Sequence, residues 1–276
     1  MTTYTFDHAT PATLEPYARF MEASANLAAL QERLADGRLS YTHLRQMHSD
    51  RGLEGVWING PGPVIVPRVR LELEAAGLHA LAEHVMRAAP DKRVILTEGA
   101  APLASAPWAA AGWTRDTHAV IAQTDLTARR WPLDPRVQER PVSDLLSGDL
   151  LALYAALVEV GTIGDTGEID PAIAFAEDVQ DEEQRLFVLV EHGTVLGAAL
   201  LTPAPPGTRG IHLLGIRPDR RGAGLGRALH AHLLAVAAQT HQRHGGTTEW
   251  DNHAMRRIFE RNGAVLREQQ QFIRGV

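Results

Sequence analysis

The sequence of 276 residues contains no cysteine, and Lys92 is the one lysine among 27 basic residues. Without cysteine the chain can have no disulfide framework, no thiolate nucleophile and no cysteine-based metal site. The scarcity of lysine indicates a GC-biased, bacterial genome and predicts no chemistry of its own.

The chain also lacks a net positive charge and long apolar segments. The formal net charge of −6 and the isoelectric point near 6.1 argue against nucleic acid or an anionic membrane as the main partner. No stretch approaches the roughly eighteen apolar residues of a membrane-spanning helix. The N-terminus also lacks the basic and apolar regions of a secretory signal. We therefore expect a cytoplasmic protein that binds neither nucleic acid nor membrane.

The thirteen histidines show no metal-binding pattern. A zinc site needs about three or four converging ligands, and the sequence has neither an HExxH motif nor matching carboxylate partners. His230 and His232 lie two positions apart on a predicted helix and so point in different directions, whereas His241 and His244 could share a face. We expect no metal cofactor.

Residues 211–237 (IHLLGIRPDRRGAGLGRALHAHLLAVA) predict a strand, a glycine loop and an amphipathic helix in succession. Gly222, Gly224 and Gly226 lie where the strand's exit becomes the first turn of the helix. A helix start presents unpaired N–H groups and the positive end of the helix dipole, and glycine lets the backbone approach an anion closely. The loop is therefore typical of a pyrophosphate-binding site. Four arginines add positive charge around it: Arg217, Arg220, Arg221 and Arg227.

Two other phosphate-binding loops do not fit this stretch. A Walker A loop ends in Gly-Lys-Ser/Thr, but Arg227 follows Gly226 here, and a Rossmann fingerprint needs a wider last interval and an acidic ribose ligand. The pattern Arg221-x-x-Gly224-x-Gly226, after a strand and a proline, instead resembles the acetyl-CoA loop of the GCN5-related N-acetyltransferases, the GNAT superfamily. The alternative is an ordinary glycine-rich turn between a strand and a helix.

The resemblance covers residues 137–276 well and the first half in outline. It implies an α/β (α+β) fold with two GNAT-like domains, each a mostly antiparallel mixed sheet flanked by helices. We assign residues 1–126 to a degenerate domain that lacks the CoA loop, 127–136 to a linker and 137–276 to the functional domain. The resemblance also implies a set of acetyl-CoA-binding residues: Leu214, Gly215, Ile216, Arg217, Arg221, Gly222, Ala223, Gly224, Leu225, Gly226, Arg227, Asn252 and Phe259.

Internal similarity favours two copies of one fold. Residues 257–273 mirror residues 108–121, each with a helix end, a glycine and a strand. In the first copy the glycine loop is replaced by residues 70–74 (RLELE), whose two carboxylates would repel a pyrophosphate. We therefore expect no CoA binding by the N-terminal copy. Two unrelated α/β halves are the alternative.

Hydrophobic periodicity predicts further elements along the chain. The first half is expected to contain a long helix from Thr10 to about Asp36 and a shorter helix over Ser40–Asp50, with Ser40 as its cap. In the second half we expect a helix over Pro171–Gln184, capped by Asp170. Trp131, in the linker, is expected to pack between the halves.

The catalytic end of the family pattern is only partly present. In the family an Asn is followed seven positions later by a Tyr that often protonates the departing CoA thiolate, and here Asn252 is followed by Phe259. A thiol has a pKa of about 8.5, so its thiolate leaves with little help at neutral pH. An alkylamine, with a pKa of about 10.4, must lose a proton before it attacks a thioester. The resemblance implies direct transfer without an acyl-enzyme, which agrees with the missing cysteine.

His212 is the best candidate for the base. It alternates in phase with Leu214 and Ile216 on the predicted strand, and some aralkylamine acetyltransferases that resemble this pattern carry a His there. Many other family members place a Glu two positions earlier, where this chain has Gly210. The alternative is a core or rim histidine with a satisfied hydrogen bond.

The acceptor side is expected to be acidic. Between Glu159 and Gln184 there is no Lys or Arg, and the resemblance implies that the loop between the first two helices of the domain lines the acceptor pocket. Asp165 and Glu168 are therefore our candidates for binding a cationic amine, and a solvated acidic surface is the alternative.

We expect an N-acetyltransferase that moves an acetyl group from acetyl-CoA, its co-substrate, to a primary amine. The acceptor is either a small amine or a peptide amino terminus. The alternative is a catalytically silent acyl-CoA-binding module, in which Phe259 and Gly210 mark lost chemistry. Oligomeric state stays open at this point.

Overall fold

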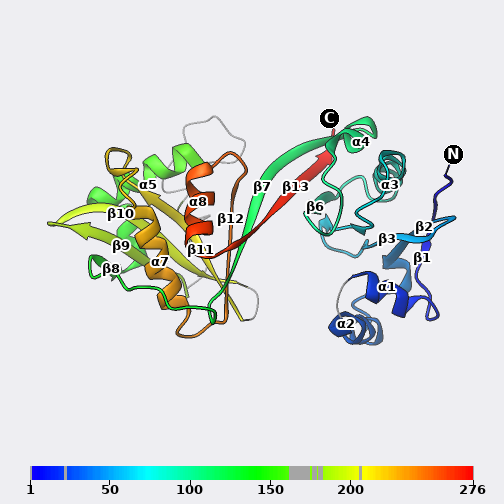
Figure 1. Ribbon diagram of the computed structural model, residues 1–276, viewed down its shortest axis with the longest axis horizontal. Helices are drawn as coiled ribbons and strands as arrows, with labels where there is room; N and C mark the ends of the chain where they lie inside the picture. The colour runs from blue at the N-terminus through cyan, green and yellow to red at the C-terminus, as the bar shows by residue number, and fades with distance from the viewer. Residues whose placement is uncertain are drawn as a thin grey trace. The chain divides into compact units, whose positions relative to one another are not determined.

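A computed structural model describes residues 2–21, 24–161, 175, 179, 183–204 and 207–275. The chain divides into two compact units (Figure 1). Unit 1 comprises Met1–Ala119 and Arg267–Val276, and unit 2 comprises Val120–Leu266. The boundaries of the units fall inside two strands, one in the middle of the chain and one at its end.

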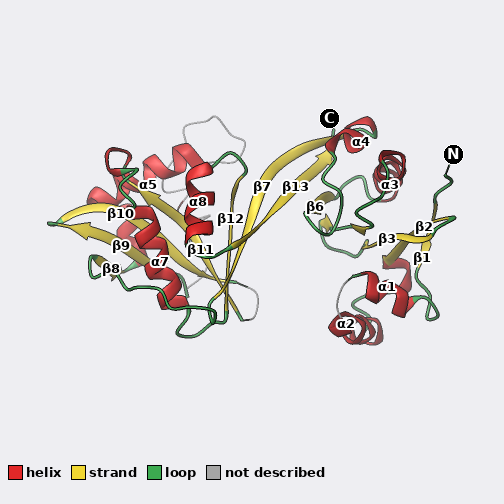
Figure 2. Ribbon diagram, in the orientation of Figure 1, coloured by secondary structure: helices red, strands yellow, loops and turns green. Residues whose placement is uncertain are grey.

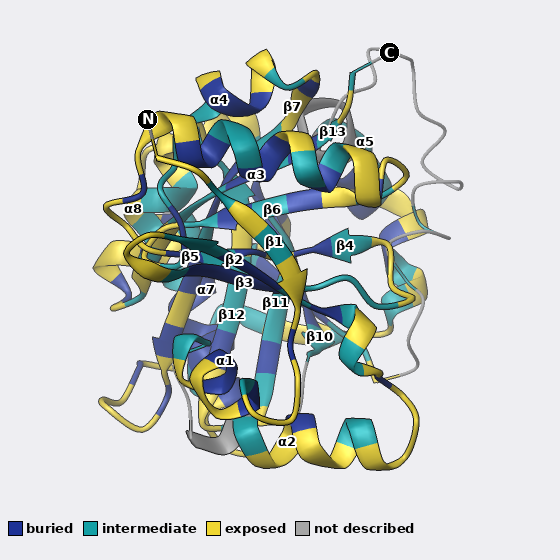
Figure 3. Ribbon diagram, turned by 90° about the vertical axis from the view of Figure 1, so that its right-hand side faces the viewer, coloured by how far each residue is buried: buried dark blue, intermediate teal, exposed yellow. Residues whose placement is uncertain are grey.

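Unit 1 contains a four-stranded antiparallel sheet with apolar clusters on both faces. The helices α1 (Leu14–Phe20) and α2 (Ser24–Ala35) share one cluster with the sheet, and α3 (Ala75–Ala88) shares the other. Strands β2 and β3 lie between these clusters and are drawn mostly dark blue and teal in Figure 3, as buried or intermediate residues. In order across the sheet the strands are β1 (Thr5–His8), β2 (Leu44–Ser49), β3 (Gly52–Ile58) and β5 (Arg68–Val69).

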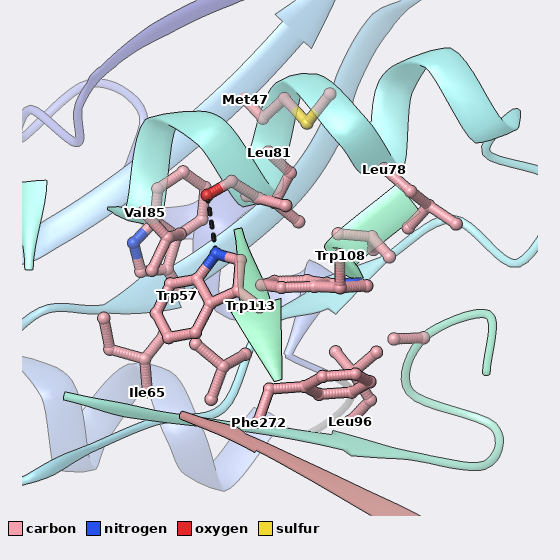
Figure 4. Packing of buried hydrophobic residues seen from close by; sticks show 14 of the residues in the cluster. Met47, Trp57, Ile65, Leu78, Leu81, Val85, Leu96, Trp108, Trp113 and Phe272 are labelled. Carbon is pink, nitrogen blue, oxygen red and sulfur yellow. Dashed lines mark hydrogen bonds between the residues drawn. The ribbon is translucent and has the colours of Figure 1, made fainter. Parts of the chain in front are cut away.

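Unit 1 also contains a second group of paired strands, and the last strand of the chain is one of them. The ring of Phe272 stacks on Trp108 with centroids 5.5 Å apart, and Trp113 Nε1 donates a hydrogen bond to Ala82 O at 3.0 Å (Figure 4). The C-terminal strand therefore completes the core of this unit. The elements are β4 (Val64–Ile65), β6 (Arg93–Thr97), β13 (Val265–Arg274) and β7 (Trp113–Asp125) in sheet order, with α4 (Ser105–Ala110).

Unit 2 is a mixed sheet with a helix against each face (Figure 2). The helix α7 (Leu225–Ala237) shares one apolar cluster with the sheet and α5 (Gly148–Gly161) shares the other, so β10 is a nearly continuous apolar run. The helix α8 (His253–Arg261) precedes β13. In sheet order the strands are β7, β12 (Arg243–Glu249), β11 (Thr208–Ile216), β10 (Thr194–Pro203), β9 (Arg185–Glu191) and β8 (Val137–Arg140).

Two predicted helices of the first half are wrong. The stretch from Thr10 to Asp36 forms two helices, because α1 already ends at Phe20. Over Ser40–Asp50 the chain forms a single 3-10 turn and then strand β2. Leu44 and Met47 would share a helix face, but in the strand each is fully buried in a different cluster, one on each side of the sheet. A strand covered on both faces therefore has the apolar spacing of a helix.

The expected position of Trp131 between the halves is also wrong. Trp131 is buried in the apolar cluster of unit 2, and its Nε1 donates to Asn262 O at 3.1 Å. The predicted helix over Pro171–Gln184 lies almost entirely outside the described residues. Among the helices that the structure describes, none combines the length and apolar character needed to cross a membrane.

Candidate functional site

The glycine loop before α7 adopts a backbone that favours glycine. Gly222 and Gly224 have φ angles of 82° and 80°, in the left-handed region. A Cβ atom on either residue would meet no other atom within 4 Å, so the space in front of the loop is open. Both residues are therefore glycine because of backbone conformation and not because of crowding.

Gly226 is a glycine for a different reason. A Cβ atom there would lie 3.1 Å from Ile258 Cδ1 and 3.5 Å from Ile216 Cγ1. The missing side chain lets the first turn of α7 pack directly on α8 and on the end of β11. Gly222 and Gly224 thus allow the turn of the loop, and Gly226 allows the helix to pack closely on α8 and β11.

The first turn of α7 has no side-chain cap. Gly224 is the N-cap residue, and within the described residues none of the N–H groups of residues 222–227 donates to a protein acceptor. At the start of α8, by contrast, Asn252 Oδ1 accepts a hydrogen bond from Met255 N at 3.0 Å. Unpaired N–H groups at a helix start, with the positive end of the dipole, favour an anion. The structure therefore fits a diphosphate at α7.

The four arginines around the loop fall into two pairs. Arg217 binds Asp219 at 3.1 Å, and Arg220 binds Glu191 at 3.1 Å. The hydrogen bond from Arg217 holds the pKa of the Asp219 carboxyl below its usual range. Hydrogen bonds from Arg136 first and Arg220 second lower the pKa of the Glu191 carboxyl in the same way. The other two arginines make no ion pair with the described residues: Arg221, whose Nε donates to Ile216 O at 3.1 Å, and the exposed Arg227.

The two parallel strands beside the loop pair over a short stretch only. The ladder joins Thr208–Gly210 to Arg243–Gly245, although β11 continues to Ile216 and β12 to Glu249. From residue 211 onward, β11 pairs with β10 on one side and has no ladder with β12 on the other. At Leu214 and Gly215 that edge of β11 therefore has no ladder partner among the described strands, and a ligand can pair with it there. This segment holds the predicted cofactor residues Leu214, Gly215 and Ile216.

A β-bulge interrupts β11 at its centre. Leu213 has a φ angle of 49°, and the register with β10 shifts there, so that Ala199 pairs with Leu214 but Leu200 pairs with His212. His212 and Leu214 therefore lie on opposite faces of the sheet. The expectation that His212 alternates in phase with Leu214 is wrong.

The bulge places His212 on the α5 side. Its partner Leu200 belongs to the apolar cluster under α5, while Leu214 packs in the cluster under α7. The His212 residue is exposed. Asp165 and Glu168, the predicted acceptor residues, follow α5 in sequence and lie outside the described residues.

Phe259 lies in the core and not on a surface. It is 2% exposed, and its ring centroid is 5.4 Å from that of His230 and 6.3 Å from that of His244. Burial lowers the pKa of His230 to about 3 and that of His244 to about 4, so both rings are neutral. Among the described residues, no three His, Asp or Glu side chains are grouped as metal ligands.

Sequence reasoning missed a buried asparagine that holds the two helices together. Asn262, 3% exposed, follows α8, and its Nδ2 lies 3.1 Å from Arg227 O and 2.9 Å from His230 Nδ1. It therefore fixes the end of α8 to the first turn of α7. Because its partners are 35 and 32 residues away along the chain, no local pattern could have indicated this contact.

These features match a known family. The profile of the acetyltransferase (GNAT) family matches residues 152–264. This part of the chain is a GNAT domain. The match confirms the predicted resemblance, and the mixed α/β fold with mostly antiparallel strands is confirmed as well. It supports acyl-CoA-dependent acyltransferase activity in general terms.

Solved structures are similar to this chain over most of its length. A GCN5-related N-acetyltransferase from Sphaerobacter thermophilus shares 16% identity, with 99% of this chain and 97% of that chain covered and a TM-score of 0.51. A GNAT-family acetyltransferase from Colwellia psychrerythraea shares 12% identity over 98% of this chain and 99% of that chain, with a TM-score of 0.49. A tandem GNAT protein from the clavulanic acid biosynthesis pathway, in a structure without acetyl-CoA, shares 15% identity over 99% and 98%, with a TM-score of 0.44.

At such identities the likeness to the Sphaerobacter protein shows a common fold and nothing about the reaction. Comparison with curated protein sequences gives no significant match.

Proposed function

We propose that the GNAT domain is an N-acetyltransferase that moves an acetyl group from acetyl-CoA to a primary amine by direct attack. The observation that carries the proposal is the start of α7. There the N–H groups of residues 222–227 have no acceptor among the described residues, and the space in front of Gly222 and Gly224 is open. This arrangement suits the diphosphate of acetyl-CoA.

The rest of the proposed cofactor site follows from the neighbouring segments. Arg221 and Arg227 supply positive charge beside the diphosphate, since neither is neutralised by a described carboxylate. The pantetheine arm is proposed to extend along β11 beyond Gly210, where the ladder to β12 has ended. Backbone N–H groups of that segment would polarise the thioester carbonyl.

The reaction needs a base more than an acid. The amine nitrogen attacks the thioester carbonyl carbon, its proton passes to a base, and the carbon–sulfur bond breaks to release the CoA thiolate. The amine has a pKa of about 10.4 and the thiol one of about 8.5, so removing the amine proton is the harder demand. We assign the base to His212, which is exposed on the α5 side of the sheet. Phe259 offers no proton, and the thiolate takes one from water.

The acceptor is proposed to be a cationic amine, either small or the amino terminus of a peptide. The support is the acidic stretch after α5, with Asp165 and Glu168 and without Lys or Arg between Glu159 and Gln184. An acetylation screen in which only neutral or anionic acceptors react contradicts this assignment.

For the first half we propose a degenerate GNAT-like copy, with domains 1–126 and 137–276 and a linker between them. Residues 70–74 precede α3 as the glycine loop precedes α7, and Glu72 and Glu74 are exposed there. Two exposed carboxylates at a helix start repel a diphosphate.

A catalytically silent acyl-CoA-binding module is the second candidate, because Phe259 replaces the family's Tyr. Two measurements separate the candidates: calorimetric binding of CoA, and release of free CoA thiol from acetyl-CoA with a broad amine panel. Thiol release that depends on an amine supports the transferase. Binding without release favours the silent module, and absence of CoA binding contradicts both.

A further inference from the structure

A cluster of basic side chains lies in unit 1, whereas the proposed cofactor site belongs to unit 2. His8, Arg45 and Trp57 are directly opposite one another on β1, β2 and β3, so their side chains form one row across the sheet. Trp57 is buried in the apolar cluster that α3 shares, so the row faces this helix. From α3, the ring of His84 stacks on Phe6 with centroids 4.1 Å apart. The sheet and the helix thus place two imidazole rings around one arginine.

The guanidinium group of Arg45 contacts both rings. Its Nη1 lies 3.1 and 3.0 Å from the two ring nitrogens of His8, and its Nη2 lies 3.0 Å from His84 Nε2. Its Nε is buried and has no hydrogen-bond partner among the described residues. No described Asp or Glu forms an ion pair with Arg45. Buried polar atoms normally have a partner, and a cation taken partly out of water normally has a negative one, so the surroundings of Arg45 are incomplete.

The electrostatics of the cluster favour an added negative charge. Burial first, and then the positive charges of Arg45 and Arg87, lower the pKa of His84 to about 4, so this ring is neutral at pH 7. Burial also lowers the pKa of Arg45, an effect that the exposed Asp7 opposes, and the guanidinium stays charged. Arg87 has Glu83 as its partner at 3.7 Å. The charge of Arg45 is therefore the one in this cluster that no carboxylate of the described residues pairs with.

The chemistry of the cluster suits a phosphate group. A guanidinium presents its N–H donors in a planar fork that binds two oxygens at once, and an imidazole that takes up a proton donates from both nitrogens. Arg45, His8 and His84 come from different elements, so together they can donate to three oxygens. A phosphate group offers these oxygens and carries about 1.5 to 2 negative charges near neutral pH, whereas a carboxylate has fewer of both. Because His8 is exposed, the cluster is open to solvent on its side.

We propose that Arg45, His8 and His84 bind a phosphate group, either free or carried by a small molecule, on the α3 side of the unit 1 sheet. Arg45 Nη1 and Nη2 donate to two oxygens of the phosphate. The two histidines take up protons from solvent and donate to the remaining oxygens. The inference does not depend on CoA at α7, and it gives a ligand to the half of the chain in which the proposed function places none.

The test follows the ring signals of His8 and His84 by NMR in the full chain, because these signals report on this cluster and not on phosphate at α7. Inorganic phosphate, glycerol 3-phosphate and acetate are titrated separately, with sodium chloride holding the ionic strength constant. Either phosphate is expected to shift both signals in a saturable way and to raise the pKa of His84 by about one unit or more. The phosphate with the lower Kd identifies the source, free or carried. Acetate that binds as tightly as both phosphates overturns the proposal, and so does the absence of a saturable shift.

Two substitutions of Arg45 make the test specific. Arg45→Gln removes the charge and should abolish the phosphate-dependent shifts. Arg45→Lys keeps the charge but loses the planar fork, so it is expected to raise the Kd of phosphate by about tenfold. Arg19→Gln is the matched control and should leave this Kd unchanged, because Arg19 is an exposed residue of α1, on the other face of the sheet. Melting curves show which variants fold. A folded Arg45→Gln with the wild-type Kd overturns the proposal, and if Arg45→Gln does not fold, an unchanged Kd in Arg45→Lys does so.

Discussion

His212 and Leu214 are two residues apart on β11 but lie on opposite faces of the sheet, because Leu213 bulges between them. Because of the bulge, the two side chains have different surroundings. Leu214 packs under α7, the helix whose first turn is open to an anion, whereas His212 lies on the α5 side. The proposed base and the proposed diphosphate site are thus separated by the sheet itself, so an amine can approach His212 without crossing the cofactor.

His212→Ala is expected to lower turnover at pH 7 by at least about tenfold with an identified amine, since no base then takes the amine proton. The Kd of acetyl-CoA should stay the same, because His212 lies on the α5 side of the sheet and the start of α7 lies on the other side. Steady-state kinetics over a range of pH check this. The ratio of wild-type to variant turnover should be largest near neutral pH. It should become smaller as the pH rises, because the amine then loses its proton without a base. Unchanged turnover at pH 7 removes His212 from the mechanism.

Gly224→Ala is expected to raise the Kd of CoA by about tenfold or more. A φ of 80° costs a residue with a Cβ about 1–2 kcal/mol, so the loop backbone is expected to relax and move the N–H groups that face the diphosphate. Gly193→Ala is the matched control. Gly193 has a φ of 79°, also with open space around it, in the β9–β10 hairpin. Both variants should melt at a lower temperature, and only the first should bind CoA more weakly. A similar Kd in both variants contradicts the assigned diphosphate site.

Asn252 has two proposed roles, as the cap of α8 and as a ligand of the cofactor. Asn252→Ala is expected to reduce the free energy of unfolding by about 1 kcal/mol, measured in urea, because the hydrogen bond to Met255 N is lost. Asn252→Asp keeps a capping oxygen and should retain stability. If Asn252 also donates to the cofactor, both variants bind CoA more weakly. Normal binding by Asn252→Asp restricts Asn252 to capping.

Acid should destabilise unit 2 through its buried histidines. The folded state holds the pKa of His230 at about 3 and that of His244 at about 4, whereas an unfolded histidine titrates at about 6.5. The unfolded state therefore binds more protons below this pH, and stability falls as the pH drops from about 6.5 toward 4. Each histidine contributes at most about 1.4 kcal/mol per pH unit.

Urea denaturation from pH 7 to pH 4.5 measures this slope. In His244→Gln the slope should be about half that of the wild type, because one of the two titrating groups is gone. His192→Gln changes a histidine in the β9–β10 hairpin, outside this buried cluster, and should leave the slope unchanged. An equal slope in His244→Gln and the wild type would show that burial does not govern the acid sensitivity.

Local patterns predicted the parts of the fold that local physics determines. The strand, loop and helix around Gly222–Gly226 follow from apolar spacing and from glycine at two left-handed positions. Over Ser40–Asp50 the apolar spacing predicts a helix, but the strand β2, buried on both faces, has the same spacing. The bulge at Leu213 had no counterpart in the sequence, since it arises from register with β10. Trp131 and Asp134 are bound to Asn262 and His232, which are distant along the chain, so no local pattern predicts these two contacts.

One CoA per chain is the expected stoichiometry, because only one of the two proposed copies has an open helix start. In the first copy Glu72 and Glu74 stand where the second copy has glycine, and their negative charge disfavours a diphosphate. Calorimetry of the full chain with CoA should give a single class of sites and a molar ratio near one. Glu72→Gln with Glu74→Gln removes the repulsion but supplies no left-handed glycine, so the ratio should stay the same. A second CoA site in the wild type contradicts the proposal that the first copy no longer binds CoA. A second CoA site in the double variant alone shows that negative charge, and not backbone geometry, prevents CoA binding by the first copy.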